Sequence, residues 1–294
     1  MEASFTAGRN FIYRQGRVVE RRLFAALYED APAEGVIEAL RAYRNQDGGF
    51  GHGLEPDKRC PASLPIDVEM AFQAMAAAGE VDAEMAQKAC DYLARVAASS
   101  ACSGAVPAAM PVIEGYPRAE HWTAWTYEPG LNPTAGLVGL LYQLGVAHPW
   151  VSEGAQYCWA QLESGSFPAG AHGMSEALIF LGQSPDRDRA GRLHDAVAAH
   201  LPTVELYHGD PDATGYGLTP LHFAPTPISP WRALFSDSQI EGHLDRLERD
   251  QQPDGGWPIT WDPPSEAAIW EWRGFETLRA LNALVAYGRL KPTE

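Results

Sequence analysis

Two stretches of this chain repeat one pattern: ALRAYRNQDGGFG at Ala39–Gly51 and LDRLERDQQPDGGWP at Leu244–Pro258. In both, apolar residues recur at helical spacing, and Asp-Gly-Gly and an aromatic residue follow. Glycine ends a helix readily because it tolerates the left-handed backbone geometry that helix C-termini often need. We therefore expect both Asp-Gly-Gly segments to be structural turns, with Gly49 and Gly256 at positive φ.

A second helix is expected after each turn, beyond a loop rich in Gly and Pro. Weaker copies of this unit occur between the two clear ones, and the alternation typical of strands is almost absent. The expected helices include the runs before the two turns and residues 18–29, 66–78, 83–98, 132–144, 151–163, 172–181, 188–200 and 266–287. Five or six helical pairs that stack on one another predict an all-α fold: one domain over residues 1–294, closed into an α/α toroid where the first and last pairs meet. An open solenoid is the alternative.

The composition limits the kinds of partner that this protein is expected to bind. The 294 residues carry a net charge of -16, with 46% hydrophobic and 20% charged residues. Such a charge repels nucleic acid and anionic lipid, and no apolar run approaches the roughly 20 residues that span a bilayer. The four cysteines form no C-x-x-C pair, which favours free thiols and a cytoplasmic protein. A small-molecule substrate remains the expected partner, and the oligomeric state is open.

The two Asp-Gly-Gly-aromatic segments resemble the repeats of squalene-hopene cyclases and protein prenyltransferase β subunits, in the terpenoid cyclase superfamily of α/α toroids. In that superfamily these motifs are structural turns, so the resemblance implies a toroid with a central cavity and no particular reaction. The chain also resembles uncharacterised, prenyltransferase-like actinobacterial proteins through GLEPD (Gly53–Asp57), GYGLTPLHFAPTP (Gly215–Pro227) and DGGWPITWDPPSEAAIWEWRG (Asp254–Gly274).

Motifs of the characterised branches are missing from the sequence. The D-x-D-D acid motif of class II cyclases is absent, and Asp67-Val68-Glu69 offers only D-x-E. There is no D-x-C, through which prenyltransferases bind zinc, and no D-D-x-x-D for a prenyl diphosphate. We therefore expect no metal and no cofactor.

Candidate site residues gather in the loops after the glycine turns and at the starts of the following helices, where ring folds carry function. The catalytic candidates are carboxylates, which act as acids when burial raises their pKa: Glu55, Asp57, Asp67, Glu69 and Glu271. Asp67 and Glu69 are two residues apart on a helix and cannot share one face. The binding candidates are mostly aromatic or polar: Trp122, Trp125, Tyr127, Glu128, Asn132, Tyr216, Trp257, Trp261, Asp262, Trp270 and Arg273. Each of these residues also has a purely structural interpretation. The tryptophans could pack between helices, Asp67 could cap its helix, and Glu271 could form an ion pair.

These residues predict an enzyme of the terpenoid cyclase type, which protonates or cyclises an apolar, isoprenoid-like molecule inside an acid- and aromatic-lined cavity. Aromatic faces can stabilise a carbocation. Two alternatives stay open: a carbohydrate-active enzyme, a glycosidase or lyase with paired carboxylates, and a binding or scaffold protein without catalysis.

Overall fold

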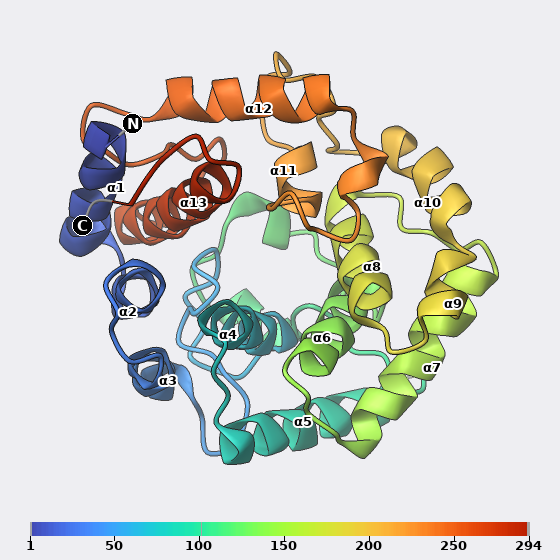
Figure 1. Cartoon of the computed structure of the whole chain (residues 1–294). Coiled ribbons are helices and arrows are strands. Elements are labelled where there is room, and N and C mark those ends of the chain that lie inside the picture. Colours follow the sequence, from blue (N-terminus) through green and yellow to red (C-terminus); the bar gives the residue numbers. More distant parts are fainter. Residues whose placement is uncertain (1, 101, 293–294) are drawn as a thin grey trace.

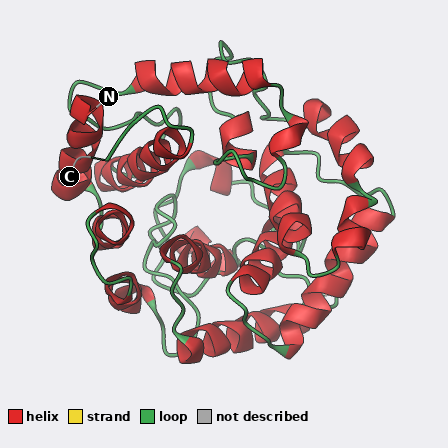
Figure 2. Ribbon diagram, in the orientation of Figure 1, coloured by secondary structure: helices red, strands yellow, loops and turns green. Residues whose placement is uncertain are grey.

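The computed structural model describes residues 2–100 and 102–292. Over these residues the chain is built from helices and loops, and extended pairing is limited to isolated bridges (Figure 2). The expected all-α class is confirmed. No helix in the described part of the chain is long and apolar enough to cross a membrane.

The helices lie in an outer and an inner set around the middle of the molecule, and the first and last helices of the chain lie side by side (Figure 1). The outer set is α1 (Glu2–Gln15), α2 (Val18–Tyr28), α3 (Glu34–Leu40), α5 (Ala83–Ala98), α7 (Pro149–Glu163), α9 (Arg187–Gly191), α10 (His194–His200) and α12 (Asp237–Asp250). The inner set is α4 (Pro65–Ala78), α6 (Leu131–Gln143), α8 (Ala171–Gln183), α11 (Pro220–Phe223) and α13 (Glu266–Ala286). Short 3₁₀ turns are η1 (Arg41–Tyr43), η2 (Pro111–Gly115), η3 (Glu120–Trp122), η4 (Leu201–Thr203) and η5 (Arg232–Leu234).

Burial explains the difference in composition between the two sets. The outer helix α5 buries one stripe that includes Met85, Ala89 and Leu93, and its other face is polar. The inner helix α6 has ten buried residues of thirteen, because helices cover it on several sides. It packs most closely on α8, where a Cβ on Gly139 would lie only 2.8 Å from the backbone carbon of Ile179. Inner helices therefore need apolar side chains and glycine almost all round.

The two Asp-Gly-Gly segments form the same turn. The Asp47 side chain accepts a hydrogen bond from Gly49 N (3.0 Å), and the Asp254 side chain accepts one from Gly256 N (3.0 Å). The expected positive φ falls on the first glycine of each pair, Gly48 (89°) and Gly255 (95°), and not on Gly49 and Gly256. The second glycines are needed for space instead, since a Cβ on Gly256 would lie 2.6 Å from the Phe11 ring.

Most expected helices are present within a residue or two, and 83–98 is exact. The expected helix over 188–200 is two helices, α9 and α10, because the chain turns after Gly191 and Leu193 N bonds to Ala190 O (3.1 Å). Helix α1 was not expected. It packs against α13, so helices from the two ends of the chain are in contact.

Candidate functional site

The loop after the first glycine turn, residues 52–60, lies against the last inner helix. Arg59 donates two hydrogen bonds to the carboxylate of Glu271 on α13 (2.5 and 3.2 Å). From the other side, Arg17 donates to the carbonyl oxygen of Leu54 (2.6 Å). Two ends of the sequence that are more than 200 residues apart thus hold one loop in place.

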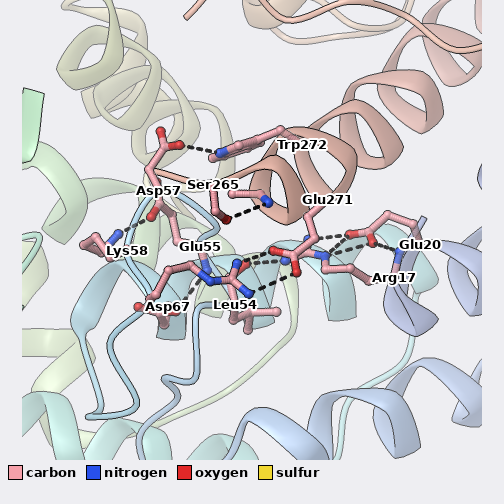
Figure 3. A network of polar contacts seen from close by, with 12 residues as sticks. Arg17, Glu20, Leu54, Glu55, Asp57, Lys58, Asp67, Ser265, Glu271 and Trp272 are labelled. Carbon is pink, nitrogen blue, oxygen red and sulfur yellow. Dashed lines mark hydrogen bonds and ion pairs between the residues drawn. The ribbon is translucent and has the colours of Figure 1, made fainter. Parts of the chain in front are cut away.

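Asp57 is the residue on which this loop and α13 converge. Its Oδ1 accepts hydrogen bonds from the indole nitrogens of Trp272 (2.8 Å) and Trp261 (3.3 Å). Its Oδ2 lies 3.6 Å from Nε2 of His121, whose side chain is half exposed, whereas the Asp57 side chain is 5% exposed. Figure 3 shows the Asp57 carboxyl directed at Trp272, with the ion pair of Glu55 and Lys58 beside it.

The surroundings favour the protonated form of Asp57. Burial, with a smaller contribution from the Glu55 carboxylate, raises the pKa of Asp57 to about 7, although the two indole N–H groups and Lys58 oppose the rise. Burial also lowers the pKa of His121, so its charge gives Asp57 little help at neutral pH. Near pH 7 the Asp57 carboxyl therefore holds a proton much of the time and can donate it.

A second buried acid, Asp67, holds the same loop through a hydrogen bond. Asp67, at the start of α4, is 1% exposed and accepts a hydrogen bond from Glu55 N (2.9 Å). Burial raises the pKa of Asp67 to about 7 as well. The Lys58 ammonium group lies 4.3 Å from the centre of the Trp122 ring and pairs with Glu55. These contacts give the buried side chains of Glu55, Asp57 and Lys58 polar partners, as a fixed site requires.

An aromatic wall extends from Asp57. The rings of Trp272 and Trp261 meet edge to face with centres 5.3 Å apart, and Trp261 meets Tyr216 in the same way at 5.2 Å. The hydroxyl of Tyr216 in turn contacts Nε2 of His172 at 2.5 Å. All three aromatic rings are partly open to solvent, and His172 is exposed. We refer to Asp57, Trp272, Trp261, Tyr216 and His172 as the acid–aromatic site.

Surrounding protein lowers the pKa of His172, mainly by removing water from around it and also through His121. Yet solvent reaches the side chain. Its electrostatic neighbours, His121 and Glu55, come from distant loops, so segments from across the sequence converge there.

Glu69, a catalytic candidate, lies elsewhere. It is 2% exposed on α4, and its carboxyl lies close to that of Glu176, which is 8% exposed on α8: a Cβ on Gly136 would be 2.7 Å from Glu69 Oε1 and 1.5 Å from Glu176 Oε2. Burial raises the pKa of both groups, and the charge of Glu69 raises that of Glu176 further. Two buried carboxyls this close are stable only when at least one of them holds a proton, so the pair shares one proton. Gly136 of α6 makes room for the pair, because a Cβ there would collide with the Glu176 carboxyl.

The remaining candidates fall into three groups. Glu271 pairs with Arg59 at the site's edge, while Trp270 and Arg273 turn toward Phe11 of α1 and Arg273 pairs with Asp254. Trp257 is buried, with its indole N–H bonded to Leu247 O (2.7 Å). The others lie between η3 and the first turn of α6, or in the turn before α13. Trp122 and Trp125 pack together with ring centres 4.4 Å apart, and Tyr127 donates to Glu114 (3.1 Å). Asn132 lies in the first turn of α6, and Glu128 and Asp262 are exposed.

Sequence reasoning did not select Trp272, His121, His172, Lys58 or Glu176. Trp272 stood in a run of tryptophans, and nothing in the run shows which ring faces Asp57. Glu176 had a weak signal, an acid between apolar residues of α8. In the described part of the chain, no three His, Cys, Asp or Glu side chains are grouped to hold a metal ion.

Comparison with known proteins establishes likeness of fold alone. No family model matches the sequence, and no curated protein matches it either. A crystal structure of a protein from Actinoplanes is similar over 97% of this chain and 99% of the other, with a TM-score of 0.57 and 18% sequence identity. At that identity the similarity shows a shared helical architecture and leaves the function to the site.

Proposed function

We propose that the helices close into an α/α toroid and that the acid–aromatic site lies at its mouth. Three glycines at positive φ support closure: Gly48, Gly104 and Gly255. Each packs directly on a carbonyl oxygen of another outer helix, namely Lys88 of α5, Glu153 of α7 and Ala7 of α1. The turn after α12 thus meets α1 as the turn after α3 meets α5, which is the contact that closes a ring.

At this mouth, we propose, the protein is a terpenoid cyclase-like enzyme that protonates an apolar, isoprenoid-like molecule, with Asp57 as general acid. The observation that carries the proposal is a buried carboxyl, its pKa raised to about 7, that faces aromatic rings. An ordinary aspartate, with a pKa of 3.8, would be almost fully ionised near neutrality and a poor proton donor.

The geometry suits proton transfer from Oδ2. When the O–H bond breaks, the alkene's π electrons form a C–H bond with the proton, and a carbocation remains on the neighbouring carbon. The indole N–H groups of Trp272 and Trp261 already bond Oδ1, so they stabilise the carboxylate as it forms. The half-exposed His121 can return a proton from solvent to Oδ2.

The aromatic wall supports the same chemistry. The ring faces of Trp272, Trp261 and Tyr216 carry negative partial charge, and each can stabilise a nearby cation by about 0.5–2 kcal/mol. The carbohydrate alternative has less support, because its paired carboxylates must stand about 5–10 Å apart, whereas the carboxyls of Glu69 and Glu176 crowd one point beside Gly136.

Two measurements test the proposal. Carboxyl ¹³C NMR of the intact protein should show two aspartate signals that titrate near pH 7, those of Asp57 and Asp67, and only one of the two should disappear in Asp57→Asn. The protein in deuterated water should also place deuterium in geraniol, farnesol, geranylgeraniol or squalene, or in their terminal epoxides. Asp57→Asn should abolish this incorporation, and Asp188→Asn, which alters an exposed carboxyl on α9, should not. An Asp57 pKa near 4 would refute the proposal.

A further inference from the structure

The far end of the aromatic wall carries a second proton-handling pair, Tyr216 and His172. They come from different elements, a loop before α11 and the first turn of α8, yet the Tyr216 hydroxyl lies 2.5 Å from His172 Nε2. Their rings are nearly parallel, at 16°. Asp57 stands at the other end, beyond Trp261, so the wall has a titratable group at each end.

The backbone holds this pair in place. Ala171 N bonds Glu205 O (2.8 Å), which fixes the start of α8, and Leu218 N bonds Leu206 O (2.8 Å), which fixes the loop that carries Tyr216. Both bonds end on the same short segment. In that segment Leu206 has a φ of 61°, an unfavourable conformation for leucine, and the neighbouring contacts maintain it.

The direction of the hydrogen bond follows from the surroundings. Burial, helped by Glu276 and Asp57, raises the pKa of Tyr216, so it remains a phenol with one proton to donate. Desolvation by the surrounding protein lowers the pKa of His172, with His121 adding to this and Glu55 opposing it, so the imidazole is neutral at pH 7. A neutral His172 protonated on Nδ1 accepts the Tyr216 proton at Nε2, and the lone pairs of the phenol oxygen remain available.

We propose that Tyr216, backed by His172, is the base that ends the reaction begun at Asp57. The inference rests on the proposed function. In this step a C–H bond next to the cationic carbon breaks, its electron pair becomes a C=C bond, and the proton moves to the Tyr216 oxygen. The phenol proton passes at the same time to His172 Nε2, which leaves a neutral tyrosine and an imidazolium.

The proton count sets the class of product. Asp57 loses one proton and His172 gains one, so the substrate is isomerised or cyclised to an alkene without net addition of water. Proton exchange with solvent, at the exposed His172 and through His121 at Asp57, then restores the starting state. Without the Tyr216 base, water would capture the cation and yield an alcohol.

The first test needs no substrate. ¹⁵N NMR of the intact protein at pH 7, with the His172 signal identified by its loss in His172→Gln, should show a neutral ring protonated on Nδ1. The Nε2 signal should shift in Tyr216→Phe, which removes the hydrogen-bond donor, and stay unchanged in Asp57→Asn. A ring protonated on Nε2, or an imidazolium at pH 7, would overturn the proposal.

The second test separates this step from the first one. With the deuterium assay, Tyr216→Phe and His172→Gln should still incorporate deuterium, and their product should change from alkene to alcohol by tenfold or more. An unchanged alkene fraction in both variants would refute the role of the pair. An ordinary pKa for Asp57 would instead refute the proposed function and leave the His172 tautomer as measured.

Discussion

The contact that joins the last turn to the first helix can be tested by adding one methyl group. Gly255 has a φ of 95°, and a Cβ on it would collide with the carbonyl oxygen of Ala7 on α1. Gly145 has a φ of 67° with no atom within 4 Å of the added Cβ. Gly145→Ala therefore measures the backbone strain alone, while Gly255→Ala measures strain plus collision.

Strain from alanine at positive φ costs about 1 kcal/mol. A backbone carbonyl cannot rotate away as a side chain can, so the collision adds about 1–3 kcal/mol of overpacking. We expect Gly145→Ala to lower the free energy of unfolding by about 1 kcal/mol and Gly255→Ala by about 2–4 kcal/mol. Gly48→Ala, which meets Lys88 O at 2.5 Å, should match Gly255→Ala.

Equilibrium denaturation in urea, followed by circular dichroism, measures these differences. Equal losses for Gly255→Ala and Gly145→Ala would show that the turn after α12 does not press on α1, and the argument for a closed ring would fail. A large loss for Gly48→Ala with a small one for Gly255→Ala would point to an open solenoid.

Three further predictions concern the buried acids Glu69 and Glu176 and the contact between the 52–60 loop and α13. Gly136→Ala should lower stability by about 1–3 kcal/mol, since its methyl group displaces the Glu176 carboxyl; an unchanged urea midpoint would contradict that packing. The folded state raises the pKa of Glu69 and Glu176 above 4.5, so the folded protein binds more protons than the unfolded chain. The two carboxyls therefore stabilise the folded state at low pH, and this stabilisation is lost as the pH rises above about 4.5. Glu176→Gln should flatten this dependence in thermal melts from pH 4 to 8, and an unchanged slope would count against the shared proton. Glu271→Gln should lower the free energy of unfolding by about 1 kcal/mol or less, because the ion pair of Glu271 with Arg59 is partly exposed. A loss above 3 kcal/mol would mean that this ion pair is a main support of the contact between the 52–60 loop and α13.

The sequence by itself determined the class of fold and most of its helices. Helical periodicity and glycine turns are local signals, since they depend on residues three or four apart and on backbone geometry. The helix at 83–98 is recovered exactly, and Asp47 and Asp254 begin the same turn. Local signals failed at the assignment of positive φ within each glycine pair, which falls on Gly48 and Gly255.

The site was decided by the tertiary structure. Asp57 was one of several loop carboxylates in the sequence, and its environment depends on two tryptophans more than 200 residues away. Glu69 seemed equivalent until the fold placed it against Glu176. A pKa depends on burial and on charges within a few ångströms, and neither follows from sequence spacing. Sequence could therefore supply the candidate acids, and only the packing of the first loop against the last inner helix separates Asp57 from the others.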